Sequence, residues 1–98
     1  MAMATLVVRE PGCVAYTVEL ADGFGVGRDP ENQLALTDRQ ASRRHARFSA
    51  AGDGYRVVDL GSTHGTLVNG VRASDHQLAD GDEIQVGKFR LVFFVAPG

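Results

Sequence analysis

The sequence predicts an all-β fold, a two-sheet antiparallel β-sandwich of about 10–11 short strands. No segment of ten or more residues shows the 3.6-residue apolar period of an amphipathic helix. Short segments rich in β-branched and aromatic residues recur instead, separated by glycine, aspartate and asparagine. Strands this short and this numerous, in a chain of 98 residues, favour two packed sheets over a small barrel.

The first three strands are expected before residue 29. Residues 5–9 (TLVVR) are rich in β-branched side chains and form the first. Apolar side chains recur at every second position over residues 14–20, which predicts a half-buried strand. Asp22 and Gly23 follow as a hairpin turn signal, and residues 24–28 leave that turn as the third strand.

Two polar loops flank the next short strand, which is expected at residues 34–36. Residues 29–32 must be a loop, because Pro30 lacks a backbone donor and restricts the residue before it. Residues 37–44 form the second loop, with room for one helical turn around residues 39–42.

The second half of the chain repeats the pattern of short strands and tight turns. The Asn69-Gly70 pair is a strong signal for a type I′ turn, since both central positions of that turn need φ > 0. Glycine and aspartate mark the other turns. The strands expected here are residues 46–50, 55–59, 66–68, 71–72, 83–86 and 89–96.

Size and composition indicate a single domain over residues 1–98, which can bury a modest core without disulfides or metal. Cys13 is the only cysteine, so no internal disulfide can form, and a reducing, cytoplasmic setting fits best. No apolar run is long enough to span a bilayer, and residues 1–8 lack the basic start of a secretory signal. We therefore expect no membrane association. A larger parent protein and a homodimer both stay open.

The net charge of −2 argues against general affinity for nucleic acid, but the charges are unevenly spread. Arg39, Arg43, Arg44 and Arg47 lie with His45 in one short stretch. A basic cluster on an acidic domain indicates a local anionic ligand. The alternative is a solvated, charged loop that is balanced by acids elsewhere in the chain.

Three polar loops, residues 28–33, 37–45 and 60–65, would form the binding site for such a ligand if they lie at one end of the sandwich. Arg28 offers a planar fork suited to two phosphate oxygens, and Ser42 adds a hydroxyl donor. No buried acid stands among these donors, which suits an oxyanion that is held and not attacked. The side chains that the loops would bring together are Arg28, Ser42, Arg43, Thr63 and His64.

Four motifs occur in an order that resembles the forkhead-associated (FHA) domain family. They are Gly27-Arg28, Ser42-Arg43-Arg44-His45, residues 59–70 (DLGSTHGTLVNG) and residues 78–87 (LADGDEIQVG). Each fragment alone is weak, because pairs such as Gly-Arg occur in any protein. Together the motifs make a specific match over residues 24–94, which is nearly the whole chain.

The resemblance implies a sandwich that recognises phosphothreonine in partner proteins. On the matching positions, Arg28 and Ser42 would bind the phosphate, with Arg43 as a second charged contact. Thr63 would line the pocket beside the phosphothreonine, and His64 would hold the backbone of the bound peptide. The family most often has asparagine at position 64. A neutral imidazole keeps one donor and one acceptor, so we expect binding to survive and the selectivity after the phosphothreonine to change.

Five further motif positions are implied to be structural rather than in contact with the ligand. His45 would tie loops together by hydrogen bonds, and Asp59 would cap the loop that follows it. Three histidines and one cysteine do not form a recognisable metal-binding spacing, so no metal is expected, and no cofactor is expected either. The structural positions are Gly27, His45, Gly65, Asn69 and Gly70.

Three other functions were weighed against this one. Ser42, His45 and Asp59 are the residue types of a hydrolytic triad, but no nucleophile-elbow motif surrounds the serine, so we do not expect an enzyme. A nucleic-acid binder could use the arginine cluster, but it would lack aromatic residues beside it on which bases stack. An FHA-like domain could also mediate assembly without phosphate, and the retention of both Arg28 and Ser42 argues against that.

Overall fold

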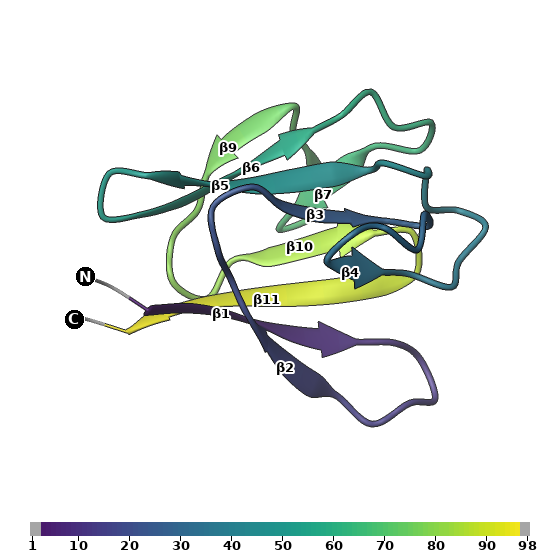
Figure 1. Cartoon of the computed structure of the whole chain (residues 1–98), viewed down its shortest axis with the longest axis horizontal. Coiled ribbons are helices and arrows are strands. Elements are labelled where there is room, and N and C mark those ends of the chain that lie inside the picture. Colours follow the sequence, from purple (N-terminus) through teal and green to yellow (C-terminus); the bar gives the residue numbers. More distant parts are fainter. Residues whose placement is uncertain (1–2, 97–98) are drawn as a thin grey trace.

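The computed structural model describes residues 3–96, and these residues form two packed β-sheets (Figure 1). Eleven strands lie within the described residues, so the predicted all-β sandwich is confirmed. No helix in this part of the chain is long and apolar enough to cross a membrane.

The larger sheet has six strands in the order β2-β1-β11-β10-β7-β8. Its neighbouring strands pair antiparallel, and the longest pair joins β1 to β11 from Met3↔Ala96 to Arg9↔Arg90. The strands of this sheet are β1 (Met3–Arg9), β2 (Tyr16–Glu19), β7 (Thr66–Val68), β8 (Val71–Arg72), β10 (Glu83–Val86) and β11 (Phe89–Ala96).

The smaller sheet has five strands in the order β4-β3-β5-β6-β9. The pairing of β3 with β4 is parallel, which departs from the antiparallel sandwich that the sequence predicts. Its strands are β3 (Phe24–Gly27), β4 (Leu34–Ala35), β5 (Ala46–Ala51), β6 (Gly54–Asp59) and β9 (Asp75–Gln77).

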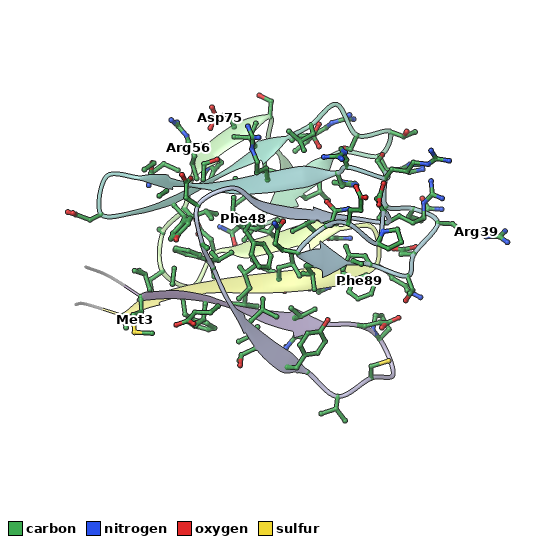
Figure 2. The ribbon with its side chains drawn as sticks, viewed as in Figure 1. Met3, Arg39, Phe48, Arg56, Asp75 and Phe89 are labelled. Atoms are coloured by element: carbon green, nitrogen blue, oxygen red, sulfur yellow. The ribbon has the colours of Figure 1, made fainter. Side chains whose placement is uncertain are left out.

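The core lies between the sheets and is built from alternate residues of the central strands. Leu6 on β1 and Leu91 and Phe93 on β11 are completely buried, as the period of two along a strand requires. From the other sheet, the ring of Phe48 packs edge-to-face on Phe24 with the ring centroids 6.3 Å apart. Figure 2 shows Phe48 between the two layers. This apolar interior holds the strand ends, and therefore the loops, in fixed positions.

The strand predicted over residues 14–20 is shorter and more exposed than expected. It begins at Tyr16, and the side chains of Val14 and Tyr16 are 91% and 49% exposed. The reason is that β2 is an edge strand, so one of its sides has no neighbour. The hairpin expected at Asp22-Gly23 is also wrong. Gly23 does turn, with a φ of 80°, but β2 and β3 belong to different sheets and do not pair.

One strand was not predicted. β9 (Asp75–Gln77) is polar and partly exposed, and it pairs with β6 at the edge of the smaller sheet. Because an edge strand can direct polar side chains to solvent, no apolar alternation marks it in the sequence.

The turns lie closer to their predicted conformations than the edge strands do. Asn69 and Gly70 both have positive φ, at 51° and 83°, as the predicted type I′ turn requires. The helical turn expected around residues 39–42 is instead a β-turn, in which the N–H of Ala41 donates to the carbonyl of Asp38 at 3.1 Å.

The start of β1 and the end of β11 lie at one end of the sandwich, and the loops that carry the predicted site lie at the other (Figure 1). These are the loops between β3 and β4, between β4 and β5, and between β6 and β7. The smaller sheet supplies a strand to each, so its rigidity sets their relative positions.

Candidate functional site

The three loops meet around one shallow pocket of about 340 Å³. The five residues predicted to come together do so here. Arg39, Gln40 and Ala41 line the pocket as well and were not predicted. The lining residues are Arg28, Arg39, Gln40, Ala41, Ser42, Arg43, Thr63 and His64.

Arg28 follows the last residue of β3 and is held at both its backbone and its side chain. Its N–H donates to the carbonyl of Ser42 at 2.9 Å, and its Nε donates to the carbonyl of Ala41 at 3.2 Å. Among the described residues, the two terminal guanidinium nitrogens have no hydrogen-bond partner. The side chain is therefore oriented by one donor while its other donors stay available to a ligand.

Gly27 lets this close approach of two loops happen. A Cβ built on it would lie 2.2 Å from the carbonyl oxygen of Arg43 and 2.9 Å from that of Ser42. These distances are far below van der Waals contact, so no larger residue fits without moving the backbone. Asn32 adds a further tie, because its Nδ2 donates to the same Arg43 carbonyl at 2.8 Å.

Ser42 links the second loop to the third. Its hydroxyl accepts a hydrogen bond from the N–H of Thr63 at 3.0 Å. A hydroxyl that accepts in this way still has its own proton to donate. Ser42 thus directs one donor toward the pocket and also positions Thr63 beside it.

His45 is completely buried beneath the same two loops. Its Nδ1 accepts from the N–H of Ser42 at 3.0 Å, and its Nε2 lies 2.8 Å from the carbonyl oxygen of Gly65. An N–H donor on one side and a carbonyl on the other require a neutral ring with its proton on Nε2. Both ring nitrogens of His45 are hydrogen-bonded within the protein, and His45 is not part of the pocket lining.

Asp59 organises the loop that carries Thr63 and His64. Its carboxylate accepts hydrogen bonds from the hydroxyls of Ser62 and Thr66 and from the N–H groups of Gly61 and Ser62. Burial on its own would raise the pKa of this carboxyl, but these hydrogen bonds outweigh burial and lower the pKa below the ordinary 3.8.

The hydrolytic triad considered from the sequence is not assembled. The group of Ser42 that contacts His45 is its backbone N–H and not its hydroxyl. Among the described residues, the hydrogen bonds of the Asp59 carboxylate go to its own loop and to Thr66, and none goes to His45. The same part of the chain holds no group of three or more metal-ligating side chains.

Asp38 is an anchor that sequence reasoning missed. Its carboxylate accepts from the N–H of Gln40 at 3.0 Å and from that of Lys88 at 2.7 Å. Burial would raise its pKa, but these two N–H groups lower it. The contact joins the β4–β5 loop to the turn between β10 and β11 across fifty residues of sequence. The aspartate lies in the loop predicted over residues 37–44, and its sequence context carries no signal of a partner that distant.

The remaining structural positions, Gly65, Asn69 and Gly70, are not part of the pocket lining. Gly65 is buried with a φ of 86°, and a Cβ there would lie 2.7 Å from the Nε of Arg72. The Asn69 amide donates to Asp82 at 2.9 Å and accepts from the N–H of Glu83 at 3.0 Å. Asn69 thus joins the β7–β8 turn to the start of β10, and neither Asn69 nor Gly70 lines the pocket.

The electrostatics of the pocket follow from its lining, which includes three arginines and no carboxylate. A second hollow of about 170 Å³ adjoins it through Gln40 and His64 and has no arginine, lysine or acid in its lining. The pocket can therefore hold an anion, and the neighbouring hollow can receive an uncharged group attached to it. The hollow is lined by Gln40, His64, Gly65, Leu67, Gln85 and Gly87.

Comparisons with known proteins agree on one family. A family model described as the FHA domain matches residues 24–87. An oxoglutarate dehydrogenase inhibitor from Corynebacterium jeikeium is 54% identical over 67 residues, covering 68% of this chain and 46% of that protein. The glycogen accumulation regulator GarA of Mycolicibacterium smegmatis is 49% identical over 71 residues, covering 72% of this chain and 45% of that protein. The chain thus spans about half the length of these curated relatives.

A solved structure resembles the whole domain. It comes from a structural and functional analysis of phosphothreonine-dependent FHA domain interactions and has a TM-score of 0.88 at 33% identity. The match covers 98% of this chain and 99% of the other, so the likeness extends beyond the residues that carry the motifs.

Proposed function

The chain belongs to the forkhead-associated domain family, and from this membership we propose that it binds phosphothreonine in partner proteins. The observation that carries the proposal is the convergence of Arg28, Ser42 and Arg43 on one pocket without a carboxylate in its lining. A phosphate dianion needs several donors and positive charge, and this lining supplies both.

In the proposed complex, Arg28 and Ser42 bind the phosphate. Arg28 uses the guanidinium nitrogens that the Ala41 carbonyl leaves available, and Ser42 uses its hydroxyl proton. Arg43 adds a second positive charge. Thr63 and His64 come from the β6–β7 loop and contact the peptide around the phosphothreonine. Gly27 and His45 support this geometry without touching the ligand.

We propose that the domain is a regulatory binding module and not an enzyme. The relatives are named as an inhibitor and a regulator, and the chain matches about half of each. We propose that residues 1–98 form one domain whose parent protein carries further segments. A cytoplasmic location belongs to the proposal because the cysteine, Cys13, is exposed and free, which suits a reducing compartment.

A calorimetric titration tests the proposal with three versions of one peptide, carrying phosphothreonine, phosphoserine or unmodified threonine. We expect binding only to the phosphorylated versions. The threonine methyl group, if fully buried, adds about 0.8 kcal/mol, which is roughly fourfold over phosphoserine. Equal affinity for the unmodified peptide would instead support the phosphate-independent assembly function.

The site assignment is tested with Arg28→Ala, which we expect to abolish phosphopeptide binding. Arg47→Ala is the matched control, because Arg47 is an exposed arginine on β5 that does not line the pocket. Undiminished affinity in Arg28→Ala, or an equal loss in Arg47→Ala, would refute the assignment of the phosphate to this pocket.

A further inference from the structure

We propose that Arg39 selects partners that carry an acidic side chain close to the phosphothreonine. This inference rests on the proposed phosphothreonine binding and adds a specificity-determining residue to it. It is independent of the residues that would hold the phosphate itself.

The pocket carries more positive charge than a bound phosphate would balance. A phosphothreonine side chain carries about −1.5 to −2 at neutral pH, so two arginines suffice to balance it. Arg28 and Arg43 are the two beside Ser42, and Arg39 is a third guanidinium in the lining. Once the phosphate is bound, the positive charge of Arg39 remains to be balanced by another acid.

The protein itself does not supply that acid. Within residues 3–96, none of the three arginines of the pocket has a carboxylate within 4.0 Å. Elsewhere on the surface, Arg44, Arg56 and Arg90 each form an ion pair. The nearest acid in sequence is Asp38, but backbone N–H groups of Gln40 and Lys88 occupy its two oxygens.

Arg39 is an exposed residue on a well-anchored turn. It is the second residue of the β-turn from Asp38 to Ala41, whose backbone is fixed by the 3.1 Å hydrogen bond that closes it and by the Asp38 carboxylate. Among residues 3–96 its side chain has no hydrogen-bond or ion-pair partner, and Figure 2 shows it reaching outward from the loop end of the domain. Arg28, by contrast, is tied to the Ala41 carbonyl. Arg39 is thus placed to meet residues that flank the phosphothreonine.

The adjoining hollow differs from the pocket in the charge of its lining. That hollow shares Gln40 and His64 with the pocket, but no arginine, lysine or acid lines it. A peptide that crosses both therefore meets excess positive charge on the Arg39 side and neutral groups on the other. The preference for an acid should consequently be confined to the few peptide positions that can reach Arg39.

The experiment moves a single glutamate through an otherwise uncharged phosphothreonine peptide, from three residues before the phosphothreonine to four after it. Each glutamate peptide is compared with its glutamine counterpart, by calorimetry or fluorescence anisotropy, at low and high salt. The proteins are the wild type, Arg39→Gln, and Arg47→Gln as an exposed arginine outside the pocket. Glutamine keeps the length and polarity of the side chain while removing its charge.

We expect glutamate at one or two neighbouring positions to tighten binding about two- to fivefold in the wild type and in Arg47→Gln, as for an exposed ion pair. The gain should vanish in Arg39→Gln and shrink at high salt, because ions screen exposed charges. Arg39→Gln should weaken binding of these glutamate peptides more than binding of their glutamine counterparts, and that difference isolates the ion pair.

Three results would overturn the inference: no glutamate position improves binding, the improvement survives in Arg39→Gln, or Arg39→Gln weakens all phosphopeptides equally. The last result would make Arg39 a phosphate contact. Each of these leaves phosphothreonine binding by the wild type intact. Failure of every phosphopeptide to bind the wild type would instead refute the proposed function itself, so the two failures are distinguishable.

Discussion

The stability of the domain should depend strongly on His45, although this residue does not face the pocket. Replacing it with alanine removes two hydrogen bonds at a site with 0% exposure, one from the Ser42 N–H and one to the Gly65 carbonyl. The two backbone groups belong to different loops, and the imidazole is the link between them. The substitution therefore removes a contact between loops as well as side-chain volume.

The size of the effect follows from what is left behind. A buried donor or acceptor without a partner costs about 1–3 kcal/mol, and His45→Ala leaves one of each. A water molecule that enters the vacated space would recover part of this cost. We expect the free energy of unfolding to fall by about 3–5 kcal/mol, which is a large share of the about 5–15 kcal/mol typical of a domain.

Equilibrium unfolding in urea measures this difference, with two further variants as controls. His45→Phe refills the volume but supplies no polar atom, so it should be about as destabilised as His45→Ala if the hydrogen bonds dominate. His64→Ala changes an exposed histidine and should alter the free energy of unfolding by less than about 0.5 kcal/mol. A loss below about 1 kcal/mol in His45→Ala, or full recovery in His45→Phe, would refute this account of the residue.

Three further predictions concern the loops and their anchors. Ser42→Ala should weaken phosphopeptide binding by about tenfold or more, since a hydrogen bond to a charged group contributes about 1.5–3 kcal/mol; titration of a phosphothreonine peptide measures it, and unchanged affinity would contradict the assignment. Gly27→Ala should lower both stability, by about 1–3 kcal/mol, and binding, because the Arg43 carbonyl must move away from the new methyl group; thermal unfolding and titration of one sample measure both. The pKa values of Asp38 and Asp59 are lowered in the folded state, so their contribution to the free energy of unfolding is full above about pH 4 and is lost as the pH falls through the folded-state values. Urea unfolding from pH 5 to 2.5 should show this loss of stability. The free energy of unfolding of Asp59→Asn should depend less steeply on pH over the same range.

The fold could be predicted from the sequence wherever one face of a strand is buried. The central strands β1, β5, β6, β10 and β11 carry apolar residues at every second position, and their expected bounds differ from the observed ones by two residues at most. The edge strands are predicted less well. β2 is apolar by pattern but exposed, and β9 is a strand without any apolar pattern. An edge strand pairs with a neighbour on one side only and can stay exposed on the other. Its side chains therefore carry little information about where it lies.

The site shows the same division between local and distant information. Positions with a local chemical signature, such as Arg28, Ser42 and the Asn69-Gly70 turn, were identified from the residues and from the family resemblance. Asp38 was missed because its second partner, the N–H of Lys88, is fifty residues away and belongs to the backbone. The sequence places Arg39 in a cluster of arginines, but it does not predict that Arg39 lines the pocket. A backbone donor leaves no mark in the sequence, so such anchors become visible only in three dimensions.

The pocket owes its order to groups that never meet the ligand. His45 joins the β4–β5 loop to the β6–β7 loop, Asp38 joins the β4–β5 loop to the β10–β11 turn, and Asp59 ties the β6–β7 loop to the start of β7. The β3–β4 loop is held to the β4–β5 loop by hydrogen bonds to its backbone carbonyls. These contacts form when the domain folds, so the conformational entropy of the loops is already lost before a peptide arrives. The glycine-rich loop at residues 59–70, the most conspicuous motif in the sequence, is therefore not a flexible clamp. The Asp59 carboxylate ties this loop together by hydrogen bonds, and the loop places Thr63 and His64 in the lining of the pocket for which we propose phosphate binding.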